Sequence, residues 1–88
     1  MNAIAGAGAL LSRGQEVPVT YDLVQSPESS RFSAEGEVFG EARALIEVFN
    51  SGPCNLRLET GRAVQVVLIV CHLHGAAEVR VSGPVQWN

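Results

Sequence analysis

Turn-forming residues divide the chain into short segments, and this punctuation limits the folds open to it. Clusters of Gly, Pro, Ser and Asn occur at 26–30 (SPESS), 50–53 (NSGP), 59–62 (ETGR), 74–76 (HGA) and 82–84 (SGP). Most segments between them have strand length, and several alternate apolar with polar residues, the pattern of a strand with one buried face. This alternation runs over residues 17–23, 32–38, 55–59 and 77–82. The pattern predicts an all-β fold, a small antiparallel barrel or sandwich of about six strands.

The segment 41–50, EARALIEVFN, fits two secondary structures. As a helix it would place four apolar residues on one face at the spacing i, i+3, i+4, i+7, namely Ala42, Leu45, Ile46 and Phe49. As a strand it would direct its even-numbered residues from 42 to 48 inward. The Ile-Glu-Val-Phe run and the strand-like neighbours favour a strand. An α+β fold with a helix at 41–50 is the alternative.

The length of 88 residues allows one domain, and 47% hydrophobic with 17% charged residues is typical of globular chains. We assign residues 15–88 to a single β domain and residues 1–14 to a flexible or docking N-terminal arm. The apolar stretch in this arm lacks a preceding Lys or Arg and is too short to span a membrane. Gly6 and Gly8 supply only G-x-G, which is insufficient for a phosphate-binding loop.

The charge balance bears on partners and on location. All six basic residues are Arg, against nine acidic residues, for a net charge of −3, which disfavours non-specific nucleic-acid binding. A nucleic-acid-binding barrel that uses Phe32, Phe39 and exposed arginines is therefore a further alternative only. Two cysteines do not form a disulfide framework and the chain has no N-glycosylation triplet, so we predict a cytoplasmic protein. We also expect that it requires no cofactor.

The most apolar run, VQVVLIVCHLHG at 64–75, organises the predicted core. A two-residue turn at His74 and Gly75 would pair Val70 with Val79 and Leu68 with Val81. On its other side, a three-residue loop within 59–62 would pair Leu56 with Val66 and Cys54 with Leu68. This register separates the two cysteines by more than a disulfide allows, so we predict that both thiols are free.

The other face of this run is apolar as well. Val67, Ile69, Cys71 and Leu73 would point away from the core, although their hairpin neighbours at 78, 80 and 82 are polar. The N-terminal arm, a second copy of the chain or another partner should cover these four side chains, because their exposure costs stability. We favour a second copy. The sequence thus predicts a non-enzymatic, self-associating β module for binding or assembly, with a homo-oligomer as its state and a small molecule or protein as a further ligand.

The same run contains the residues on which a catalytic alternative rests. Cys71 and His72 are adjacent in the predicted strand and face opposite ways, so they do not form a nucleophile and base pair. His72 and His74 would share a face at a spacing that suits one metal ion. With a carboxylate such as Glu78 they define the alternative of a small metal-dependent enzyme, although we expect neither a metal nor enzymatic activity.

Overall fold

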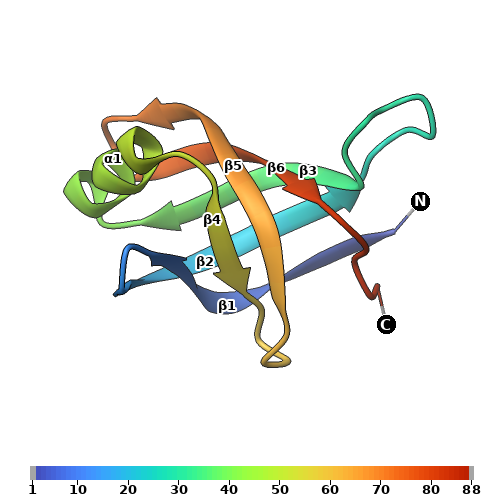
Figure 1. Cartoon of the computed structure of the whole chain (residues 1–88), viewed down its shortest axis with the longest axis horizontal. Helices are drawn as coiled ribbons and strands as arrows, with labels where there is room; N and C mark the ends of the chain where they lie inside the picture. Colours follow the sequence, from blue (N-terminus) through green and yellow to red (C-terminus); the bar gives the residue numbers. More distant parts are fainter. Residues whose placement is uncertain (1, 88) are drawn as a thin grey trace.

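The computed structural model describes residues 2–87, which form six strands and one helix. The elements are β1 (Ala3–Ser12), β2 (Gln15–Gln25), β3 (Ala34–Gly40), α1 (Ala42–Ser51), β4 (Cys54–Arg57), β5 (Ala63–His72) and β6 (Ala76–Ser82). The strands close into an antiparallel barrel in the order β1-β2-β3-β6-β5-β4. Helix α1 lies at one end of the barrel, and both chain termini lie at the other (Figure 1). The predicted small antiparallel barrel of about six strands is confirmed.

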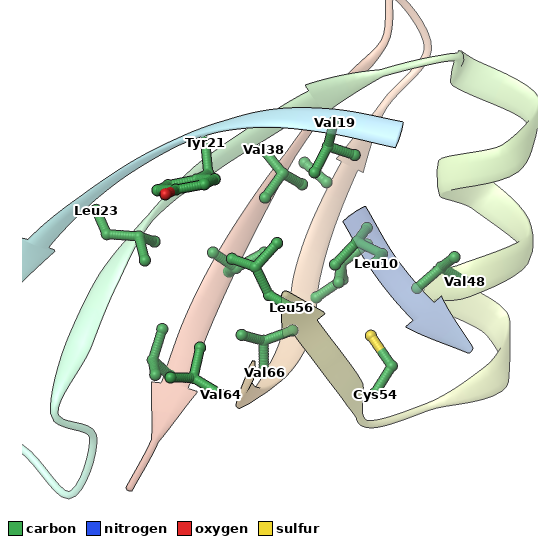
Figure 2. Packing of buried hydrophobic residues seen from close by; sticks show 14 of the residues in the cluster. Leu10, Val19, Tyr21, Leu23, Val38, Val48, Cys54, Leu56, Val64 and Val66 are labelled. Carbon is green, nitrogen blue, oxygen red and sulfur yellow. The ribbon is translucent and has the colours of Figure 1, made fainter. Parts of the chain in front are cut away.

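The barrel interior is filled by the residues that alternate inward along each strand. In β2, for example, every second residue from Val17 to Leu23 is buried. Figure 2 shows Leu10 of β1, Leu56 of β4 and Val66 of β5 pointing into the same interior. The largest fully buried side chains are Leu10, Leu23, Leu45, Leu56, Val38, Val66, Val79 and Val81. The period-two alternation therefore identified the inner face correctly.

Residues 42–51 form a helix, so the strand prediction for 41–50 is wrong and its helical alternative is right. The Glu41 side chain accepts hydrogen bonds from the backbone N–H groups of Arg43 and Ala44, which are left without partners in the first turn of a helix. Leu45 and Val48 are buried against the barrel end, whereas Phe49 is 38% exposed. The buried stripe is therefore rotated from the predicted one, because the helix closes one end of the barrel and does not extend the sheet.

Most of the predicted N-terminal arm is instead a barrel strand, since residues 3–12 form β1 between β2 and β4. Ala and Gly have low strand propensity, and this concealed the strand. The glycines are explained by their neighbours: Gly6 is the partner of Tyr21, and a Cβ at Gly8 would lie 2.0 Å from the backbone oxygen of Arg57. Residue 1 of the predicted arm lies outside the described residues.

Both predicted hairpin registers around β5 are displaced: that of β4–β5 by two residues, and that of β5–β6 by one residue between the turn and Val70 and by two residues from Leu68 onward. The β5–β6 loop has three residues, 73–75, and the observed pairs include His72 with Ala76 and Leu68 with Val79. The β4–β5 loop has five residues, 58–62, and pairs Leu56 with Val64. The loops are longer than predicted because the left-handed glycines, Gly75 (φ 98°) and Gly61 (φ 94°), each follow further turn residues. A shift of two residues preserves the faces, so Val64, Val66 and Leu68 remain buried as predicted.

Candidate functional site

The outer surface of β5 is shaped by a β-bulge. Leu68 pairs with Val79 and Val70 pairs with Glu78, so Ile69 is an extra residue without a partner on β6. Ile69 is 38% exposed and Val70 is 40% exposed, whereas Leu68 is buried. The bulge thus places two consecutive large apolar side chains where strict alternation would place one.

The structure separates the four residues that the sequence analysis assigned to the outer face. Val67 lies half-buried on the outer side, Ile69 is exposed, and Leu73 is 84% exposed in the β5–β6 turn. Cys71 is on the inner side, because it follows the bulge, pairs with the fully buried Ala77 and packs against the core. Val70 takes the outer position in its place. We name the three outward-facing strand residues Val67, Ile69 and Val70, together with Leu73 of the turn, the β5 patch.

The predicted pairing of Val70 with Val79 in the core is wrong, because the bulge turns Val70 outward, where it pairs with Glu78. In a run as uniformly apolar as VVLIV, no polar residue marks the position at which the inward and outward sides exchange. Every adjacent pair in this run is apolar, so the exchange of sides is visible only in the pairing of Leu68 with Val79 and of Val70 with Glu78.

Groups of both charge signs and a further apolar side chain adjoin the β5 patch. Val67 pairs with Arg80 and Val70 pairs with Glu78 across the β5–β6 ladder. On the same side of the barrel, Phe39 of β3 is 42% exposed and pairs with Ala76, the residue that also pairs with His72. The apolar surface is therefore bordered by the carboxylate of Glu78 and the guanidinium of Arg80.

Three carboxylates follow one another around the outside of the barrel next to the patch. Asp22 pairs with Glu37, and Glu37 pairs with Glu78, across the neighbouring strands β2, β3 and β6. Like charges directly opposite in a sheet repel, and this row opposes the approach of phosphate groups. Phe39 lies beside these carboxylates, while Phe32 is half-buried in the β2–β3 loop. The aromatic and basic residues of the nucleic-acid alternative thus do not form one surface.

The arginines are similarly dispersed. Arg57 of β4 donates two hydrogen bonds to Glu16, at 2.8 and 3.2 Å, and this guanidinium holds the pKa of the Glu16 carboxyl below its usual value. Both side chains are well exposed, which is the setting in which an ion pair adds little to stability. This pair is therefore typical of a solvated surface.

The two histidines lie close together at the end of β5. The His72 and His74 rings are stacked with centroids 5.5 Å apart, and His72 Nε2 is 3.5 Å from Glu78 Oε2. Within residues 2–87, however, no three His, Cys, Asp or Glu side chains are grouped so that they could hold a metal ion. The stacked rings and the single carboxylate contact therefore lack the three-ligand arrangement of a catalytic zinc site.

The two cysteines are free, as predicted. Cys54, the first residue of β4, is buried in the barrel interior, and Cys71, near the end of β5, is half-buried. Burial raises the pKa of both thiols above the ordinary value, because the apolar surroundings disfavour the thiolate. A raised pKa is the opposite of what an activated nucleophilic cysteine needs.

These observations define the class of protein as a small closed antiparallel β-barrel capped by one helix, with an exposed apolar surface on β5. Comparisons of the chain with family models, with curated proteins and with solved structures found no match. The described part of the chain contains no helix with the length and apolar character needed to cross a membrane. Function must therefore be argued from the surface itself.

Proposed function

We propose that this protein is a non-enzymatic binding or assembly module that self-associates through the β5 patch and works as a cytoplasmic homo-oligomer. One observation carries the proposal: the bulge in β5 directs Ile69 and Val70 together out of the barrel, and Leu73 in the turn that follows is 84% exposed. The free thiols of Cys54 and Cys71 support a reducing compartment.

A monomer would leave the apolar side chains of the β5 patch in water and lose the free energy that their burial contributes. Moving one large aliphatic side chain from water to an apolar contact contributes about 1.5–3 kcal/mol. Leu73 would gain most of this, because it is almost fully exposed, while Ile69 and Val70 are already partly covered by their neighbours. Bulges at functional surfaces commonly serve to redirect side chains. The β5 patch therefore fits a surface that is covered in the working state of the protein.

A second copy is the partner that best fits the surroundings of the patch. The N-terminal segment, which the sequence analysis considered as a cover, is built into the barrel as β1 and is not free to lie over β5. A two-fold axis that crosses β6 between Glu78 and Arg80 would bring Glu78 of each copy toward Arg80 of the other, so this border can be self-complementary. The carboxylate row through Glu37 repels its own copy and directs contact toward β5.

The β5 patch alone is smaller than a stable protein interface. A stable protein interface buries about 800 Å² on each partner, which is more than four side chains supply. Phe39 is 42% exposed on the same side of the barrel and extends the apolar area across β6 toward β3. We therefore place the contact over β5 and β6, with Ile69 and Val70 near its centre and Phe39 at its border.

Solution mass tests the proposal directly. Sedimentation equilibrium of the wild type should give a dimer or larger assembly, and Ile69→Glu should give a monomer, because the substitution buries a charge in the contact. Val24→Glu is the matched control, since Val24 is 37% exposed on β2, three strands away from β5, and should leave the assembly intact. A monomeric wild type at concentrations up to the millimolar range would refute self-association, and dissociation by both variants would remove β5 as its site.

A further inference from the structure

The barrel has an open seam beside β1. β1 pairs with β2 along its whole length, but it pairs with β4 over three residues, Ala9–Leu11. Residues 3–8 of β1 thus have a second backbone edge that no strand of residues 2–87 occupies. In Figure 1, β1 continues past the end of β4 toward the end of the barrel where the termini lie.

The direction of the backbone groups along this edge follows from two hydrogen bonds. The Asn2 carbonyl accepts from Gln25 N–H of β2, while Ala7 N–H donates to Glu59 Oε1, at 3.3 Å, on the opposite side. Backbone groups of alternate residues in an antiparallel strand point to alternate sides. Ala3 and Ala5 therefore direct their N–H and C=O groups to the seam, as Ala7 does. At Ala7 a carboxylate side chain takes the place that a strand carbonyl would occupy.

The seam adjoins a cavity of about 370 Å³. Its lining combines the apolar residues Ile4, Ala5 and Leu58 with Tyr21 and the polar residues Glu59, Thr60, Arg62 and Gln86. The Tyr21 hydroxyl accepts a hydrogen bond from Glu59 N–H, at 3.0 Å, which fixes the turn beside the cavity. Arg62 forms no ion pair with another side chain of residues 2–87. The cavity thus offers an apolar space and a cation next to unpaired strand backbone.

Natural sheet edges are usually protected by lysine, proline, a bulge or a covering segment. The edge of β1 at residues 3–5 has no lysine, proline or bulge, and its outward side chains are the alanines Ala3 and Ala5. Such a strand presents backbone hydrogen-bonding groups without a large side chain of its own beside them. This is the arrangement by which a sheet accepts an extended peptide as an added strand.

We propose that the seam beside β1 binds an extended peptide segment of another protein. The segment adds to Ala3–Ala5 as a strand, places one large apolar side chain in the cavity, and directs an acidic side chain to Arg62. This site goes beyond the proposed function and does not rest on it, since the β5 patch lies elsewhere on the barrel.

The occupant follows from the shape and chemistry of the site. The cavity beside this edge is lined by residues of the β4–β5 turn at 58–62 and by Gln86 of the C-terminal segment, and its volume of about 370 Å³ suits one side chain of an extended peptide. The C-terminal segment of this chain is already engaged, since Val85 and Trp87 pack against the core. The unpaired charge of Arg62 selects an acidic residue in the partner.

The test uses the full chain, labelled with ¹⁵N, and a capped seven-residue probe peptide. The probe alternates threonine and valine, carries a central phenylalanine, and has a glutamate two positions away so that both side chains share a face. Binding should shift the amide signals of Ala3, Ala5 and Tyr21 and slow hydrogen exchange at Ala5. The control peptide has the same sequence with methyl groups on the amides that would donate to β1, and it should not bind.

Two protein variants separate the parts of the site. Ala5→Pro removes an N–H that points away from β2, so the β1–β2 ladder is retained, and it should weaken probe binding at least about tenfold relative to Ala5→Ser. Arg62→Gln should weaken the glutamate probe but not its glutamine counterpart. The proposal is overturned if millimolar probe shifts none of these signals, if the methylated peptide binds equally, or if the shifts map to β5. Because the β5 variants are assayed by solution mass, failure of either proposal leaves the other distinguishable.

Discussion

Gly8 lies where the backbones of β1 and β4 approach each other closely. A Cβ there would lie 2.0 Å from the backbone oxygen of Arg57, a group that cannot rotate away. Gly8→Ala should therefore destabilise the barrel by about 1–3 kcal/mol, the usual cost of overpacking, as measured by urea unfolding. Ala5→Ser, at an exposed position of the same strand, should change the free energy of unfolding by less than about 0.5 kcal/mol. Equal stability of Gly8→Ala and wild type would show that β1 and β4 separate easily.

The two thiols should differ in reactivity because they differ in burial. Iodoacetamide should alkylate the half-buried Cys71 before the buried Cys54, with mass spectrometry of Cys71→Ser to assign the sites. The pKa of both thiols is raised by burial, so alkylation of the folded protein should remain slow until the pH exceeds the ordinary thiol range. Faster reaction of Cys71 than of a free thiol at neutral pH would contradict this account.

The same raised pKa values set the sign of a stability change. A group that holds its proton more tightly in the folded state contributes stability that is present below its unfolded pKa and is lost as the pH rises through its folded pKa. The free energy of unfolding should therefore fall on the alkaline side of the ordinary thiol pKa, and Cys54→Ala should reduce that fall.

At the scale of elements, α1 depends on its first turn. Glu41 accepts from two backbone N–H groups, those of Arg43 and Ala44, which otherwise lack partners. Glu41→Ala should lower the free energy of unfolding by about 1 kcal/mol, and Glu41→Asp should restore most of it. Glu47→Ala, at an exposed position in the same helix, serves as the matched control. If Glu41→Ala and Glu47→Ala unfold alike, the cap does not hold the helix.

The elements differ in how well the sequence predicts them. Val17 to Leu23 alternate with polar residues and are a correctly predicted strand, because one face meets the core and the other meets water. Strand β1 was not predicted, because its small residues have low strand propensity. They are explained by close contacts with Tyr21 and Arg57, which are distant in sequence. Residues 41–50 were predicted as a strand because their local strand propensity is high. Their helical state depends on packing against the end of the barrel, which local propensity does not include.

At the scale of the whole molecule, the surface is less predictable than the core. The sequence indicated that β5 is apolar on both sides, and Ile69 and Leu73 are indeed exposed. It assigned both Cys71 and Val70 to the wrong side, because the bulge between Leu68 and Val70 arises from the pairing with β6 and not from the local pattern. The seam beside β1 was not foreseen at all, since it exists only where β4 ends before β1 does.

Self-association through the β5 patch has a consequence for stability that a monomer cannot show. When folding and association are linked, mass action raises the unfolding midpoint as the protein concentration rises. The urea midpoint of the wild type should therefore increase with concentration, whereas the midpoint of Ile69→Glu should be constant. Val24→Glu has a similar exposed fraction at its site and should follow the wild type.

The concentration dependence of the stability difference between the wild type and Ile69→Glu separates self-association from a simple loss of core packing. Ile69 is 38% exposed in the single barrel, so Ile69→Glu should cost little at low concentration, where the wild type is itself monomeric. The two unfolding curves should converge on dilution and separate on concentration, because the missing free energy belongs to the contact between copies. A constant gap at all concentrations would instead place the contribution of Ile69 inside one barrel, and the β5 patch would lose its role in assembly.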